Sequence, residues 1–272
     1  MSATSHIQFF RLTPVITEKD KNKGPSPEEI RANIPPEICS GCGESYSGAE
    51  KLKNCAGCRA ARYCSRHCQV SDWPTHKPLC GGSVSSTDIH LKLAKKLMAN
   101  VDLMFYLKVY TVLALDLLTT PENALNTCLI VKLITRDADH MAALRAMMNG
   151  EERGLGTPIM LQIASIEKKP LLSHTTAAMR TSIDKTRAGI PSPDWPIVMI
   201  LFTGDDVNCL ATPCVIDPQA LQQGRERNPF VIQSAMMGRQ EIPVEEKTII
   251  EQFNNKIYMD KQNRYLLHTK SK

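Results

Sequence analysis

The strongest constraint on this chain is a dense run of cysteine and histidine between residues 39 and 80. Four closely spaced pairs follow one another in it: Cys39 with Cys42, Cys55 with Cys58, Cys64 with Cys68, and His76 with Cys80. Zn²⁺ in a structural site takes four nitrogen or sulfur ligands in a closed tetrahedron, so eight ligands predict two zinc ions. The spacing alone does not say which pairs share an ion.

Seven of the ten cysteines lie in this run. A disulfide scaffold is the alternative to metal binding, but such scaffolds belong to small secreted chains. Here a long chain with its own apolar segments follows the run, and the first residues lack the pattern of a secretory signal. We therefore expect an intracellular protein, in the nucleus or cytoplasm. The other cysteines, expected to be buried as small hydrophobic residues, are Cys128, Cys209 and Cys214.

The residues around the last two pairs carry a family resemblance. Ala61-Arg62-Tyr63-Cys64-Ser65-Arg66-His67-Cys68-Gln69, followed by Asp72-Trp73-x2-His76-Lys77-x2-Cys80, resembles a MYND-type zinc finger. All eight ligand positions match, and His67 is not a ligand in that family. MYND fingers are interleaved, so the resemblance implies that the first and third pairs share one zinc ion and the second and fourth share the other. The implied sets are Cys39, Cys42, Cys64 and Cys68, and Cys55, Cys58, His76 and Cys80.

The resemblance also implies a function, because MYND fingers dock short, often proline-containing peptides. Trp73 would offer an aromatic face, and Gln69, four residues earlier on the same short helix, a donor and an acceptor for a peptide backbone. Aromatic grooves suit proline-rich ligands because these are already extended. The alternative is that Trp73 only packs over the second zinc site. At the turns of the finger, Gly41, Gly43 and Gly57 are expected where φ is positive.

The search for catalytic chemistry finds no motif. The enzymes best known for a MYND finger are SET-domain lysine methyltransferases, in which the finger interrupts the SET fold. Here residues 1–38 are polar and lack a glycine-rich cofactor turn, and Asn208 is followed by Cys209 rather than by a cofactor motif. Gly154-x-Gly156 lacks the third glycine of a nucleotide loop. We predict that the chain is not an enzyme; the alternative is a methyltransferase-like active site in the C-terminal domain, with the finger recruiting substrate.

Charge and hydropathy argue against two further classes of partner. The net charge of +5 is mild, and acidic residues are interspersed throughout, so nucleic-acid binding is not indicated. The most apolar stretch, residues 97–118, carries Asp102, Lys108 and Asp116, which argue against a membrane span. These charges share one arc of a helical wheel, as expected for a helix buried against a core. An apolar stripe that binds a membrane or a partner is the alternative for this segment.

The whole chain is predicted to combine a small two-zinc MYND finger with a C-terminal α/β domain. Residues 1–37 are expected to be a flexible N-terminal arm with a short helical turn at 27–33, and residues 38–81 the finger. Residues 82–87 form a Gly/Ser-rich linker, and residues 88–272 a mixed sheet of four or five strands with packed helices. Strands are predicted at residues 127–135, 159–166, 196–202, 209–216 and 230–232. Helices are predicted at 88–98, 99–118, 137–149, 173–187, 218–225 and 245–257, with a frayed tail from Tyr265.

Overall fold

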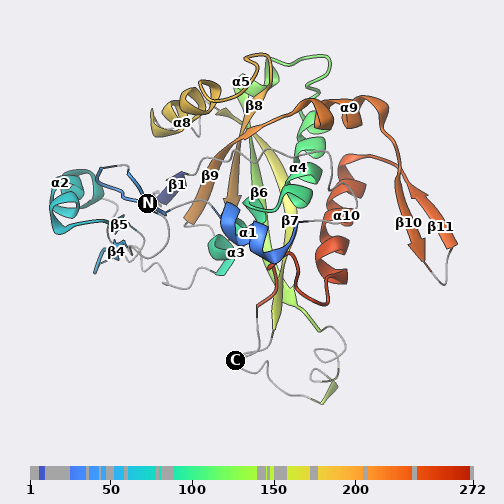
Figure 1. Cartoon of the computed structure of the whole chain (residues 1–272), viewed down its shortest axis with the longest axis horizontal. Coiled ribbons are helices and arrows are strands. Elements are labelled where there is room, and N and C mark those ends of the chain that lie inside the picture. Colours follow the sequence, from blue (N-terminus) through green and yellow to red (C-terminus); the bar gives the residue numbers. More distant parts are fainter. Residues whose placement is uncertain are drawn as a thin grey trace.

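The computed structural model shows a layered α/β body, with the finger as a lobe on one side (Figure 1). It describes residues 6–9, 25–34, 37–42, 44–46, 52–57, 61–77, 80, 89–139, 145, 148–149, 158–171, 177–204, 208–234 and 238–269, and all structural statements concern these residues. The predicted linker at 82–87, the turn at Gly154-x-Gly156 and most of the predicted helix at 137–149 lie outside them.

A five-stranded sheet forms the centre of the body, in the order β1-β9-β8-β6-β7. β6 and β8 run parallel, as do β1 and β9, whereas β7 is antiparallel to β6 and β9 is antiparallel to β8. The sheet is therefore mixed, as predicted. The strands are β1 (His6–Phe9), β6 (Thr127–Asp137), β7 (Ile159–Pro170), β8 (Ile197–Thr203) and β9 (Asn208–Val215).

Helices cover both faces of the sheet. One face carries α3 (Ile89–Met98), α4 (Val101–Ala114) and α10 (Glu246–Met259), while α9 (Pro218–Glu226) packs on α4. The other face carries α8 (Ala177–Arg187), and α5 (Asn123–Asn126) leads into β6. Because β8 is central and covered on both faces, six of its seven residues are buried, which explains its continuous apolar sequence.

The apolar stretch at 97–118 breaks into a bend, a helix and turns. α3 ends at Met98, and Asn100 caps the start of α4, where its side-chain oxygen accepts a hydrogen bond from the backbone N–H of Leu103 at 3.2 Å. α4 ends at Ala114 rather than at the predicted 118. No single described helix is long and apolar enough to cross a membrane; α3 and α4 meet that criterion only when taken together, and they meet at an angle of 88°.

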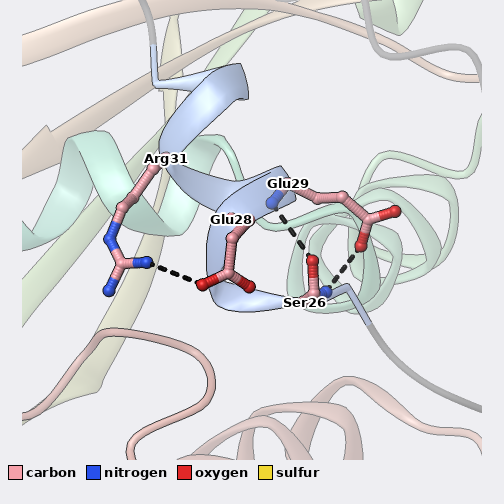
Figure 2. A network of polar contacts seen from close by, with 4 residues as sticks. All are labelled: Ser26, Glu28, Glu29 and Arg31. Carbon is pink, nitrogen blue, oxygen red and sulfur yellow. Dashed lines mark hydrogen bonds and ion pairs between the residues drawn. The ribbon is translucent and has the colours of Figure 1, made fainter.

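The N-terminal arm, predicted to be flexible, contains a strand and a helix among its described residues. β1 extends the sheet by pairing with β9. α1 (Pro27–Asn33) begins at a capping box in which Ser26 and Glu29 bond each other's backbone N–H, and it buries Ile30 completely (Figure 2). The helical turn predicted at residues 27–33 corresponds to α1. β1 was not predicted, because it depends on a partner strand about two hundred residues away.

The C-terminal tail is also ordered, contrary to the prediction of fraying from Tyr265. Its backbone pairs with the outer edge of β7: the N–H of Leu161 donates to the carbonyl of Leu267 at 3.0 Å, and the N–H of Thr269 donates to the carbonyl of Ile159 at 2.7 Å. Leu267 is fully buried. The tail therefore covers an edge strand that would otherwise present unpaired backbone groups.

The predicted strand at 230–232 does not join the sheet. β10 (Phe230–Ser234) instead pairs with β11 (Gly238–Ile242), a strand that was not predicted, in a two-stranded ribbon that stands out beyond α10 (Figure 1). At the base of the ribbon, Phe230 stacks on Tyr106 of α4, with ring centroids 5.2 Å apart.

The finger is built from four two-residue strands and one helix. They are β2 (Glu37–Ile38), β3 (Ser45–Tyr46), β4 (Lys53–Asn54), β5 (Arg62–Tyr63) and α2 (Arg66–His76). The finger and the body approach each other at β5 and α3. Burial, and then the nearby charge of Arg62, lower the pKa of Lys95 on α3 to about 8.

Candidate metal centre

Two short hairpins and α2 present the cysteine and histidine side chains. β2 pairs with β3, and β4 pairs with β5. Each hairpin turn begins at a cysteine whose backbone N–H bonds across it, from Cys39 to the carbonyl of Glu44 at 2.9 Å and from Cys55 to that of Ala61 at 2.8 Å. α2 begins where the Ser65 hydroxyl accepts a hydrogen bond from the N–H of Cys68. Local backbone bonding thus sets the direction of each ligand side chain.

The first cluster joins the first and third pairs of the sequence. The sulfur atoms of Cys39, Cys42, Cys64 and Cys68 all lie within 4.8 Å of one another. The Cys42–Cys64 distance is 3.9 Å and the Cys64–Cys68 distance 3.4 Å. Four sulfurs at the usual zinc–sulfur bond length of about 2.3 Å form a tetrahedron with edges of about 3.8 Å. The donor set and its spacing therefore fit a closed zinc site.

The second cluster joins the second and fourth pairs. Ligand atoms of Cys55, His76 and Cys80 lie within 4.8 Å of one another, and the two sulfurs are 3.7 Å apart. Cys58, the fourth predicted ligand, lies outside the described residues. The two clusters alternate along the chain, which is the interleaved arrangement that the family resemblance implied. α2 supplies one ligand to each cluster, Cys68 to the first and His76 to the second.

Hydrogen bonds in the first cluster favour the thiolate, the form of cysteine that binds metal, at Cys39 and Cys64. Burial disfavours the charged form of Cys39, but backbone N–H groups of Cys42, Cys64 and Gly41 outweigh it, and the pKa of Cys39 falls to about 6. The N–H of Cys64 lies 3.4 Å from the Cys39 sulfur. A hydrogen bond from the Tyr46 hydroxyl lowers the pKa of the Cys64 thiol.

The other two cysteines of the first cluster shift the opposite way. The backbone N–H of Glu44 lowers the pKa of Cys42, but side-chain hydrogen bonds within the cluster outweigh it and raise that pKa to about 11. A hydrogen bond with Ser65 lowers the pKa of Cys68, but the hydrogen bond with Cys64 opposes it, and the pKa of Cys68 is also raised.

Two of the three glycines have a different role from the one predicted. A side-chain carbon at Gly41 would lie 2.5 Å from the backbone oxygen of Cys68, and one at Gly57 would lie 2.9 Å from the sulfur of Cys80. Neither has a φ in the left-handed region. Close approach to a ligand residue, rather than positive φ, therefore requires glycine at both positions. Gly43 lies outside the described residues.

The finger has a small apolar core. Apart from cysteines, the buried hydrophobic residues among its described positions are Leu52 and Tyr63. The Tyr63 hydroxyl donates a hydrogen bond to the Asp72 carboxylate at 2.7 Å, which ties β5 to α2. So few buried side chains cannot offset the entropy of ordering the finger, so metal binding is expected to supply much of its folding free energy. The sequence analysis gave neither Tyr63 nor Asp72 this role, although both lie in the segment that carries the resemblance.

The predicted docking residues lie on α2. Trp73 is 41% exposed, and on one side its ring contacts the ring of His76, with centroids 5.9 Å apart. Gln69, one helical turn earlier, is half-buried. Val70 is 63% exposed and lies three residues before Trp73, on the same side of the helix. Val70 was not predicted as a docking residue, although its spacing of three residues from Trp73 indicates the same side of a helix.

The cysteines outside the finger do not form another cluster. Cys128, Cys209 and Cys214 are each buried in the body, and burial raises the pKa of Cys209 and of Cys214 to about 11. Among the described residues, groups of three or more cysteine, histidine or acidic side chains close enough to share an ion occur only in the finger. His67 is exposed and belongs to neither cluster.

Comparison with known proteins gives matches over the finger. A family model described as the MYND finger matches residues 39–80. Human histone-lysine N-methyltransferase SMYD3 is 44% identical over 48 residues, which cover 16% of this chain and 11% of that protein. Mouse protein CBFA2T2 is 41% identical over 54 residues, which cover 20% of this chain and 8% of that protein. The Drosophila melanogaster zinc finger MYND domain-containing protein 10 homolog is 53% identical over 32 residues, which cover 12% of this chain and 7% of that protein.

The matched part of this chain thus spans no more than 11% of the length of any of these three relatives. No solved structure matches the chain. The family match, the spacing of the ligands and the two interleaved clusters coincide over the same segment. Residues 39–80 are a MYND-type zinc finger.

Proposed function

We propose that this chain is an intracellular adaptor, in the nucleus or cytoplasm, whose finger binds two zinc ions and docks a short proline-containing peptide of a partner protein. The peptide lies across Gln69 and Trp73 of α2. The observation that carries the proposal is the position of Trp73, which contacts a metal-ligating side chain on one side and is 41% exposed on the other. An aromatic ring held in this way is preorganised, so little of its binding energy is lost in ordering it.

The two-ion count rests on the donor sets. Four cysteines fill a tetrahedron at the first cluster, and Cys55, His76 and Cys80 leave one position at the second for Cys58. When bound, zinc supplies a fixed charge that holds the thiolates and the imidazole together. With four protein ligands each site is closed, which suits a structural rather than a catalytic ion. The role of the metal is then to fix the backbone that presents α2.

The docking face combines apolar and polar groups in the way that extended peptides require. Val70 and Trp73 form an exposed apolar surface on a short helix, and Gln69 lies beside them with an amide that can both donate and accept. A proline-rich peptide is already extended and leaves backbone carbonyls free, so it can stack on the indole and accept a hydrogen bond from the glutamine. The MYND finger is a protein-interaction module, and this face is its most apolar exposed surface among the described residues.

Recruitment without catalysis is the simplest account of the remaining chain. The histone-lysine N-methyltransferase relative aligns only over the finger, so this match gives no support for a methyltransferase activity in residues 88–272. An enzyme whose active site lies in the C-terminal domain is the alternative. Saturable binding of S-adenosylmethionine to the whole chain, measured by calorimetry, would favour it over the adaptor.

A peptide selection tests the proposal. A library of short peptides with and without proline is selected on the zinc-loaded chain, and the recovered sequences are titrated against variants. Gln69→Ala is expected to weaken binding about fivefold, the loss of roughly one hydrogen bond of 1 kcal/mol. Met259→Ala, at a residue 70% exposed on α10, is the matched control and should bind as the wild type does. Removing zinc with a chelator should abolish binding. Selected peptides that bind equally well without zinc, or equally well to Gln69→Ala, would contradict the proposal.

A further inference from the structure

β10 and β11 form a separate sheet of two strands. β11 pairs with β10 on one side, and no other described strand pairs with either of them. The ribbon projects beyond α10 (Figure 1), and at its base Phe230 stacks on Tyr106 of α4. A two-stranded ribbon alone is marginally stable in water, and an open strand edge offers a row of backbone groups for another strand. Two further strands would stabilise the ribbon and would pair the backbone groups of its open edge.

The charges on β11 specify what kind of strand fits its open edge. Arg239 and Glu241 lie two residues apart on one face of the strand, where they form an ion pair at 3.0 Å, and both are exposed. Gln240 lies between them. If a second β11 pairs antiparallel with the first and Gln240 lies opposite its own copy, Arg239 of each chain faces Glu241 of the other. Opposite charges directly across a strand pair are favourable.

The same charges destabilise the neighbouring antiparallel registers. With Arg239 opposite its own copy, two cations meet, and with Glu241 opposite its own copy, two anions meet. Like charges directly opposite are destabilising, so one antiparallel register is favoured over its neighbours. β10 carries no charged residue and therefore offers no comparable selection. Such a contact uses the same surface on both chains and closes as a two-fold dimer.

We propose that the β11 edge is a homodimer interface, in which two copies of this chain pair antiparallel about Gln240 into a four-stranded sheet. Two reciprocal pairs of Arg239 with Glu241 fix the register. Five residues from each strand give a small contact, so the dimer is weak and its population rises with protein concentration. An adaptor that dimerises in this way carries two fingers, which would raise its avidity for partners with repeated peptide motifs.

Charge reversal with complementation tests this interface. Sedimentation equilibrium of the wild type should show a mass rising from 30.3 kDa toward twice that value with concentration. Arg239→Glu alone and Glu241→Arg alone each replace two attractive pairs by two repulsive ones, so each should weaken dimerisation about tenfold or more. Mixing the two variants in equal amounts should restore a dimer containing one chain of each, because every cross-strand pair is again of opposite charge.

Two controls separate the interface from folding. Arg180→Glu makes the same charge change at an exposed position on α8 and should dimerise as the wild type does. The double reversal Arg239→Glu with Glu241→Arg in one chain keeps the ion pair within the strand and should dimerise alone, even if a single reversal disturbs the ribbon. A wild type that remains monomeric at every concentration would overturn the proposal. So would single variants that still dimerise normally, or a mixture of the two that stays monomeric.

Discussion

At the scale of single residues, the ligands were predictable and their surroundings were not. Metal ligands at short spacings bring their own geometry, so Cys39, Cys64 and His76 could be assigned without a structure. The hydrogen bond from Tyr63 to Asp72 joins a strand to a helix, and the exposed apolar surface of Val70 depends on which side of α2 faces the metal. These features depend on packing, which spacing does not encode.

The close approach of Gly41 to Cys68 yields a prediction about metal affinity. In Gly41→Ala the new carbon would lie 2.5 Å from the backbone oxygen of Cys68, so the first hairpin has to move away from α2. Overpacking of this kind costs about 2 kcal/mol, or roughly thirtyfold in zinc affinity at the first cluster. Competition with a chromogenic chelator measures it, with Arg66→Ala, at an exposed position on α2, as the control. Equal affinities for the two variants would contradict the crowding.

At the scale of elements, strands with continuous apolar sequence were predicted and strands defined by their partners were not. β8 is recognisable because it is buried on both faces. β11 has the polar sequence Gly-Arg-Gln-Glu-Ile and exists by pairing with β10, while β1 is four residues in a polar arm. The order of the C-terminal tail comes from backbone bonds to β7. The local periodicity of the sequence does not indicate which distant segments pair with each other.

One side chain caps the outer edge of β7, and its removal is a test at this scale. The Asn254 amide accepts a hydrogen bond from the N–H of Ile163 and donates one to its carbonyl, each at 2.9 Å. Asn254→Ala should lower the free energy of unfolding by about 2 kcal/mol, because two hydrogen bonds of roughly 1 kcal/mol are lost. Asn255→Ala, at the neighbouring exposed position, should change it by less than about 0.5 kcal/mol. Urea unfolding measures both, and equal effects of the two substitutions would refute the capping role.

At the scale of the whole molecule, the finger and the body depend on different forces. The body buries a large cluster of apolar side chains between its sheet and helices, whereas the buried cluster among the described residues of the finger is Cys39, Leu52, Cys55 and Tyr63. The division into residues 38–81 and 88–272 stays a prediction. The pairing of β1 with β9 shows that the sheet of the body includes chain from the N-terminal side of the finger, and the charge of Arg62 in the finger acts on Lys95 of α3.

Metal removal tests this division. A chelator, or the ligand substitution Cys64→Ser, should unfold the finger, because the metal supplies its folding free energy. The body should keep its secondary structure and its own thermal transition. Circular dichroism and hydrogen exchange of β6 and β8 follow the body, and zinc content follows the finger. Loss of the body together with the finger would show one cooperative unit instead.

The docking face is tested most directly by one variant on which zinc content and peptide affinity are measured together. Trp73→Ala removes the aromatic anchor but no metal ligand, so it should retain two zinc ions per chain and the circular dichroism spectrum of the wild type. Its affinity for a selected peptide should fall about thirtyfold, the roughly 2 kcal/mol typical of a buried aromatic anchor. Loss of zinc would instead assign Trp73 a packing role over His76. A zinc-loaded Trp73→Ala protein that binds the peptide as tightly as the wild type would contradict the account.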